Sequence, residues 1–199
     1  MSFIKVIDPK SARDRLAKTY ARVSGPGGQV DNVLQIHSLR PHSLEGHMAL
    51  YKAVLHHPLN KLPLWFLETI GVLVSTLNDC SYCVRHHSAG LKRILSGETE
   101  RYEAIVRALK PDESEELFSG AERAALAYVQ KLTSDPGAIT NEDIENMRTA
   151  GLKDGEILEV NQVAAYFAYA NRTVTGLGVS TEGEKLGLSP GESEGWEHL

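Results

Sequence analysis

Apolar residues recur along this chain with the spacing of amphipathic helices. Residues 11–23 place Leu16, Tyr20 and Val23 on one helical face with basic residues opposite, and the glycine-rich residues 25–28 end the segment. Hardly any segment alternates with the period of two residues that a half-buried strand needs. The pattern therefore predicts an all-α protein.

Glycine and proline divide the rest of the chain into further segments of helical length. The expected helices cover residues 32–40, 41–55, 62–79, 80–96, 98–111, 119–133, 140–151 and 154–178. Pro41 suits a first helical position, and Thr140 with Asp143 three residues later has the pattern of a capping box. The acidic residues 111–116 are expected to form a solvated connection.

The helical segments group into two similar sets, which suggests a pseudo-repeat of two helical halves. Both cysteines of the chain lie in the first half, so the second half is expected to serve as scaffold. With 199 residues, the chain is long enough for one sizeable domain. We expect a single multi-helical domain over residues 1–179 and a C-terminal tail over 180–199. The tail could dock on another subunit.

Charge and hydropathy restrict the partners of this domain. The net charge is −5 and basic residues are scattered among acidic ones, so no basic stripe is present to follow a nucleic acid backbone. The first residues reach charge and proline too soon for a secretory signal, and no stretch approaches the roughly 20 apolar residues of a membrane span. We expect a cytoplasmic protein without nucleic acid or membrane partners.

The candidate chemistry lies in one short stretch. Cys80 and Cys83 are three positions apart, so on a helix they lie one turn apart on the same face, close enough for a disulfide. His87 follows four positions later on that face. A helix N-terminus favours a thiolate whereas the neighbouring Asp79 opposes it, so the sequence leaves the net effect open. Glu68, inside the apolar segment 62–79, must face out of the core or have a buried partner.

Three interpretations of this stretch compete. A zinc site has four candidate ligands in Cys80, Cys83, His86 and His87, but one helical face does not readily surround a tetrahedral ion, and His86 points about 100° away from His87. Two cysteines packing as small hydrophobic residues are the second interpretation. The third is a redox dithiol, with His87 as the base and Glu68 orienting it from an antiparallel preceding helix.

The spacing E-x11-C-x2-C-x3-H, from Glu68 to His87, resembles the core motif of the alkylhydroperoxidase D and carboxymuconolactone decarboxylase superfamily. The letters CSYC followed by HH resemble its peroxidase-related members. The resemblance implies an all-α AhpD-like bundle and a homo-oligomer, a dimer or a hexamer. It also implies that Cys83 is the peroxide-reactive thiol, Cys80 the more exposed resolving thiol, and Glu68 with His87 the proton relay.

One position departs from the best-known pattern of the family. Tyr82 stands where that pattern has a second relay histidine between the cysteines, and a phenol with a pKa near about 10 donates hydrogen bonds but shuttles protons poorly at neutral pH. Tyr82 and His86 are therefore secondary site candidates, and His86 is expected to face solvent or a subunit contact.

The expected function is that of a cysteine-dependent antioxidant peroxidase acting on small or organic hydroperoxides. Electrons would come from a dithiol protein, thioredoxin-like or lipoyl-bearing, and no flavin or nicotinamide signature suggests a cofactor. The alternatives are a decarboxylase acting on a lactone acid, which has no use for a dithiol, and a non-enzymatic redox-sensing helical module.

The other histidines receive a plainer interpretation. His37, His42, His47, His56 and His57 share no ligand spacing, and we expect them to be surface residues or core residues with satisfied hydrogen bonds.

Overall fold

The computed structural model describes residues 2–25, 27–109 and 117–188, and within these ranges the secondary structure is helical, without strands. This confirms the all-α prediction. The helices are α1 (Asp14–Val23), α2 (Asn32–Gln35), α3 (Pro41–Tyr51), α4 (Leu64–Leu77), α5 (Ser81–Ile94), α6 (Thr99–Ala108), α7 (Gly120–Ser134), α8 (Asn141–Thr149) and α9 (Asp154–Gly176). Short 3₁₀ turns cover Pro9–Ser11 and Pro136–Ala138, and a π-helical turn covers Lys52–His56.

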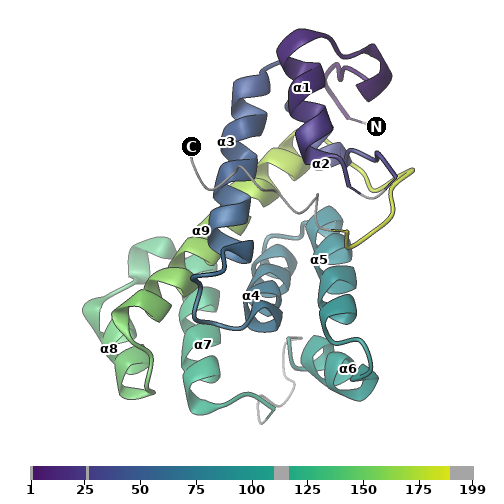
Figure 1. Ribbon diagram of the computed structural model, residues 1–199. Coiled ribbons are helices and arrows are strands. Elements are labelled where there is room, and N and C mark those ends of the chain that lie inside the picture. The colour runs from purple at the N-terminus through teal and green to yellow at the C-terminus, as the bar shows by residue number, and fades with distance from the viewer. Residues whose placement is uncertain (1, 26, 110–116, 189–199) are drawn as a thin grey trace.

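Helix α4 is the centre of the fold. It packs against α5, α7 and α9, and these neighbours surround it in Figure 1. Residues on every side of it are buried, including Phe66, Leu67, Ile70 and Val74. An apolar helix without a polar face must be enclosed by other helices, and this places anything that α4 carries inside the protein.

Two predicted boundaries on the way to α4 are wrong. The helix expected over residues 32–40 ends at Gln35 and continues as turns. The backbone of Arg40 is not helical, because the following Pro41 disfavours helical geometry there. The helix expected over 41–55 changes after Tyr51 into the π-helical turn. Such turns are frequent at functional sites, and this one carries His56.

Other local signals are confirmed. Pro41 occupies the first turn of α3, and the Asp143 carboxylate accepts a hydrogen bond from the Thr140 N–H at the start of α8. Gly97 and Gly151 have positive φ angles of 93° and 106° just beyond their helices. The acidic connection predicted over residues 111–116 lies outside the described residues.

A tight turn joins α4 to α5 and sets the position of the cysteines. The Cys80 N–H donates to the Ser75 carbonyl at 2.9 Å, and the Asp79 N–H donates to the Thr76 carbonyl at 3.1 Å. These two bonds form a Schellman motif, with Asp79 at φ 52° in the left-handed position where glycine is usual. The chain therefore reverses at once, and Cys80 becomes the N-cap residue of α5.

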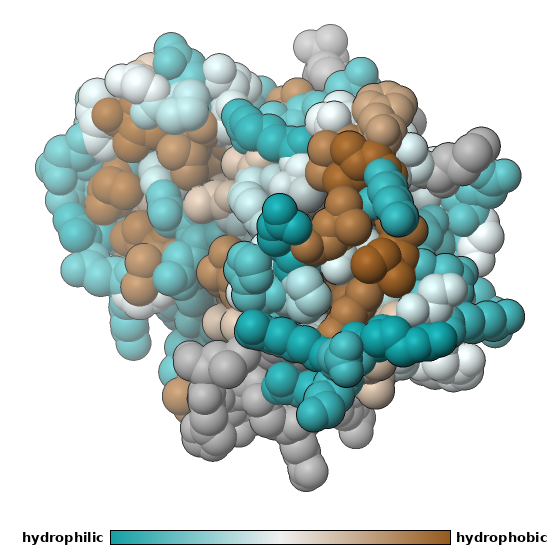
Figure 2. Space-filling view, turned by 90° about the horizontal axis from the view of Figure 1, so that it is seen from above, coloured by the Kyte–Doolittle hydropathy of each residue, from teal (hydrophilic) through white to brown (hydrophobic). Residues whose placement is uncertain are grey.

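Residues 177–188, which follow α9, lie against the same chain. The Asn32 side chain donates to the Ser180 carbonyl at 2.9 Å, and the segment up to Leu188 follows the start of α5, in yellow in Figure 1. Apolar side chains also gather in separate areas of the surface in Figure 2, between polar ones. None of the helices in the described ranges is long and apolar enough to cross a membrane.

The contact between α4 and α9 provides a test of this packing. Gly71→Ala places a Cβ where the Phe167 ring lies, so we expect a loss of about 1–3 kcal/mol in the free energy of unfolding, measured by urea denaturation. The control is Gly46→Ala, an exposed helical position with open space around it, which should gain up to about 1 kcal/mol. Equal effects of the two substitutions would contradict the packing.

Candidate functional site

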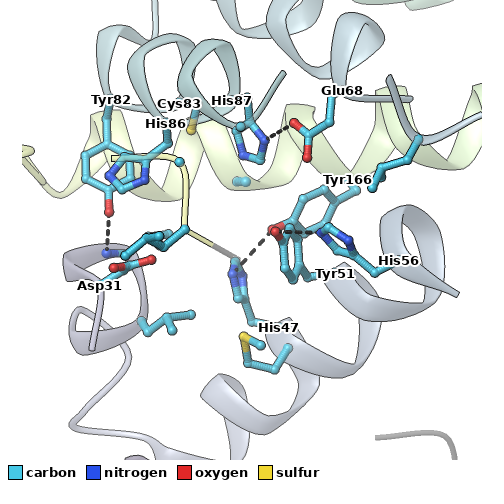
Figure 3. Close-up of a pocket in the computed structure, with 18 of the residues that line it drawn as sticks. Asp31, His47, Tyr51, His56, Glu68, Tyr82, Cys83, His86, His87 and Tyr166 are labelled. Atoms are coloured by element: carbon cyan, nitrogen blue, oxygen red, sulfur yellow. Dashed lines mark hydrogen bonds and ion pairs between the residues drawn. The ribbon is translucent and has the colours of Figure 1, made fainter. Parts of the chain in front are cut away.

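A cavity of about 270 Å³ lies between α3, α4, α5, α9 and the C-terminal segment. Figure 3 shows polar side chains of α3, α4, α5 and α9 pointing toward it. Helix α5 contributes Tyr82, Cys83, His86 and His87, and α4 contributes Glu68. Aliphatic and aromatic side chains make up most of the remaining wall. Such a cavity suits a small organic molecule with a few polar atoms.

Glu68 and His87 form a buried pair, as the predicted antiparallel hairpin requires. The Nδ1 atom of His87 lies 2.7 Å from the Glu68 carboxylate, and the two side chains are 16% and 5% exposed. The Phe167 ring contacts the His87 ring edge to face at 4.5 Å. Carboxylate and aromatic ring together hold the imidazole in one orientation.

The hydrogen bond also fixes which ring nitrogen of His87 carries hydrogen. A carboxylate accepts hydrogen bonds, so Nδ1 must be the donor. In the neutral ring, Nε2 then keeps its lone pair and can accept a proton. His87 and Cys83 lie one turn apart on α5 and both border the cavity, which is the arrangement of a base beside a nucleophile.

The two cysteines are free thiols, and the Cys83 proton is shared between them in a hydrogen bond. The Cys83 thiol donates toward the Cys80 sulfur, and together with the Cys83 backbone N–H at the start of α5 it lowers the pKa of Cys80 to about 6. Thr175 and Asn171 of α9 add smaller hydrogen bonds in the same direction. The same thiol hydrogen bond, with burial, raises the pKa of Cys83 well above its ordinary value. Cys80 is therefore the more acidic thiol of the pair and Cys83 the less acidic one.

The expectation that Cys80 is the more exposed thiol is wrong. Cys80 is 1% exposed and Cys83 is 4% exposed, and of the two only Cys83 borders the cavity. The tight turn after α4 places Cys80 against α9, on the side of Cys83 that is away from the cavity. A molecule in the cavity therefore meets Cys83 first.

The expectation that His86 faces solvent or a subunit contact is also wrong. His86 is buried, and its Nε2 lies 3.2 Å from the carboxylate of Glu184 in the C-terminal segment. The Tyr82 ring stacks on it at 4.6 Å, and the Tyr82 hydroxyl donates to the same carboxylate at 2.9 Å. Burial raises the pKa of Tyr82, which keeps this residue a hydrogen-bond donor and not a proton shuttle.

The remaining histidines only partly match their plain interpretation. His42 is exposed, and His56 is half-buried with its Nε2 2.8 Å from the Tyr51 hydroxyl. His37 and His47 are buried, and each has one ring nitrogen without a hydrogen-bond partner, so the satisfied-core expectation is wrong for them. Burial lowers the pKa of His47 to about 3 and of His56 to about 4, so both are neutral around pH 7.

The zinc interpretation finds no support in the side-chain arrangement. His86 and His87 turn to different carboxylates, Glu184 and Glu68. In the described part of the chain, no group of three or more histidine, cysteine, aspartate or glutamate side chains is placed to hold a metal ion.

Comparison with known proteins identifies the fold. No protein-family model and no curated protein matches the chain. A solved structure described as the alkylhydroperoxidase AhpD core, an uncharacterized peroxidase-related protein from Ralstonia eutropha JMP134, matches with a TM-score of 0.74 and 25% identity over 90% of this chain and 91% of its own. The chain has the AhpD-like fold.

Two further solved structures share the fold of this chain. An uncharacterized peroxidase-related protein from Silicibacter sp. TM1040 has a TM-score of 0.74 and 24% identity, covering 90% of this chain and 91% of its own. The debrominase Bmp8, as a cysteine-to-alanine variant in complex with 2,3,4-tribromopyrrole, has a TM-score of 0.69 and 17% identity, covering 92% and 95%. The fold therefore occurs in proteins described with different activities.

Within the AhpD-like fold of this chain, sequence reasoning missed contributions from distant elements. The second half is more than scaffold, because Tyr166 and Ala170 of α9 border the cavity and Asn171 reaches the cysteines. The Asn171 side chain also donates a hydrogen bond to the Ser75 hydroxyl on α4 at 3.0 Å. Glu184 had no sequence signal, since a glutamate in a glycine-rich tail is ordinary.

The shared proton predicts the ionisation of the dithiol. Titration of the reduced protein, followed by ultraviolet absorbance of the thiolate, should show one thiolate forming with a pKa of about 6. In Cys83→Ala the largest cause of the lowered pKa is gone, so the midpoint should move toward the ordinary thiol value of about 8.5. An unchanged midpoint in Cys83→Ala would contradict the shared proton.

Proposed function

We propose that this protein is a dithiol peroxidase that reduces small organic hydroperoxides, with Cys83 as the attacking thiol and Cys80 as the resolving thiol. The observation that carries the proposal is the position of Cys83, which borders an apolar cavity beside His87 and shares a proton with Cys80. A dithiol poised as one thiolate and one thiol is the starting state for two-electron reduction of a peroxide.

The first step transfers oxygen to Cys83. His87, held by Glu68, takes the Cys83 proton on Nε2, and the Cys83 thiolate attacks the terminal peroxide oxygen. The O–O bond breaks, the sulfur becomes a sulfenic acid, and the alkoxide leaves with the proton that His87 returns. The products are Cys83 sulfenic acid and an alcohol, and the negative charge stays on Cys80.

The second step closes the disulfide. The Cys80 thiolate attacks the Cys83 sulfur, the S–O bond breaks, and hydroxide leaves with one proton as water. The two residues lie one helical turn apart at the start of α5, so the sulfurs can join with little change of the backbone. The peroxide has been reduced by two electrons, both taken from the sulfurs.

A dithiol protein must then reduce the disulfide. Because Cys80 is buried behind Cys83, the reductant has to enter through the cavity and attack Cys83 first. A lipoyl group on a flexible arm fits this route better than a cysteine on the surface of a folded thioredoxin-like domain. Both reductants are dithiols, and either would reduce the disulfide by thiol–disulfide exchange.

Reductive dehalogenation of a small ring is a second candidate. The cavity has aromatic walls from Tyr51, Tyr82 and Tyr166 and a volume of about 270 Å³, which suits a flat ring. Attack of the Cys83 thiolate on a halogen would leave a ring carbanion, which takes a proton, and Cys80 would then displace halide while forming the disulfide. Release of bromide from a brominated pyrrole without reaction with hydroperoxides would favour this candidate.

The test begins with the reduced, chelator-treated protein and one equivalent of cumene hydroperoxide. Intact mass and thiol count should show prompt loss of both thiols with a mass decrease of about 2 Da, as expected for a disulfide without added oxygen. Survival of both thiols would overturn the peroxidase proposal.

Two cysteine variants separate the roles of the thiols. Cys83→Ser should abolish peroxide consumption, because no thiol then borders the cavity. Cys80→Ser should still react once and stop at the sulfenic acid, with a mass increase of about 16 Da. Peroxide turnover by Cys83→Ser would contradict the assignment, as would a stable sulfenic acid found on Cys80.

The relay is tested by His87→Ala, which should slow oxidation of Cys83 by about 100-fold or more, since general-base catalysis is lost. The measurement is stopped-flow oxidation by cumene hydroperoxide. His42→Ala, at an exposed position away from the cavity, is the matched control and should react like the wild type. Equal rates for both variants would remove His87 from the mechanism.

A further inference from the structure

The C-terminal segment 180–188 is built onto the helix that carries the cysteines. Arg85 donates to the Thr181 hydroxyl at 2.9 Å, and Gly187, at φ 70°, lies so close to the backbone of Ala89 and Gly90 that a Cβ there would overlap it. Gly187 and Leu188 border the cavity. These contacts hold the segment at a defined position beside the site.

Glu184 is the polar anchor of this segment. Its side chain is 3% exposed, and its carboxylate accepts hydrogen bonds from the Tyr82 hydroxyl, from the Asn32 backbone N–H and from His86 Nε2. A buried carboxylate costs several kcal/mol of desolvation unless donors surround it, and here three donors do so. Two of these donors belong to α5, where Tyr82 lies between the two cysteines and His86 follows Cys83 by three positions.

The result is a second carboxylate–histidine pair next to the first. His87 turns to Glu68 on α4, whereas the preceding residue His86 turns to Glu184 from the opposite end of the chain. The buried Asp31 carboxylate also acts on His86 and on Glu184 through its charge. Because a carboxylate only accepts hydrogen bonds, Nε2 of His86 carries the hydrogen of its bond to Glu184.

The proposed reaction uses two protons, and the first pair supplies only one. His87 returns the Cys83 proton to the alkoxide and is neutral when the first step ends. The hydroxide that leaves Cys83 in the second step needs another donor, and His86 borders the same cavity one turn from Cys83.

We propose that Glu184 is a positioning residue of the dithiol site, which holds His86 and Tyr82 so that His86 protonates the hydroxide released when Cys80 attacks Cys83 sulfenic acid. In this step the S–S bond forms, the S–O bond breaks, and the His86 proton joins the hydroxide as water. The inference rests on the proposed peroxidase function. In this proposal Glu184 and His86 supply the proton transfer that Tyr82, which stands in place of a histidine, does not provide.

The test measures the two steps separately. Reduced protein is mixed with one equivalent of cumene hydroperoxide, and samples taken over time are treated with dimedone, which traps sulfenic acid, before intact-mass analysis. For Glu184→Gln, sulfenic acid should form at the wild-type rate but convert to disulfide about 100-fold more slowly, so trapped Cys83 accumulates. Glu182→Gln, an exposed carboxylate two residues away, should behave like the wild type.

A second pair of variants tests the position of Glu184 while leaving its carboxylate unchanged. Gly187→Ala should displace the segment through overlap with α5 and reproduce the slow second step. Gly183→Ala has the same kind of positive φ but open space around it, so disulfide formation should stay at the wild-type rate. This pair decides the question even if Glu184→Gln fails to fold.

Each outcome has a distinct meaning. Disulfide formation at the wild-type rate in Glu184→Gln or in Gly187→Ala would overturn the inference while leaving the peroxidase proposal intact. Equal slowing of both steps would also overturn it, because it indicates a structural role only. If the wild type forms neither sulfenic acid nor disulfide, the proposed function itself fails, and the inference fails with it.

Discussion

The carboxylate of Glu68, buried on the most apolar helix of the protein, imposes the constraint on which the site depends. An ionised carboxylate inside a helical core is tolerated only with a hydrogen-bond donor, and α5 supplies one in His87. The α4–α5 turn must be tight enough to bring the two together, and the Schellman motif at Asp79 provides this. The same turn fixes Cys80 as the N-cap of α5. The position of the dithiol therefore follows from enclosing one carboxylate.

The two cysteines differ because they occupy different places on that helix. Cys80, at its start, receives hydrogen bonds from the Cys83 thiol and backbone, which favour the thiolate. Cys83, one turn on, borders the cavity and keeps the proton. The more acidic thiol is thus not the thiol that borders the cavity. Both thiols are almost fully buried, so they differ in which of them borders the cavity and not in their solvent-exposed area.

The C-terminal segment provides a second buried carboxylate, that of Glu184, which contacts α5 as Glu68 does. Glu184 is enclosed by donors from α2 and α5, so the segment lies against the site instead of extending away from it. Two consecutive histidines consequently have separate acidic partners. This arrangement argues against a metal ion shared by the two histidines.

Periodicity and spacing determined much of this protein, because helix formation and the i, i+3, i+4 relations among Cys80, Cys83 and His87 are local properties of the chain. Glu68 also followed from the sequence, since consecutive helices joined by a short turn must pack together. The end of α2 and the π-helical turn did not, because small differences in local backbone energy are decided by the packing around them.

Only the tertiary structure brought Glu184 to His86, 98 residues away, and placed Tyr166 and His47 on the cavity wall. Which faces of distant helices meet depends on the total apolar surface that the whole core buries. No single segment of the sequence determines that total.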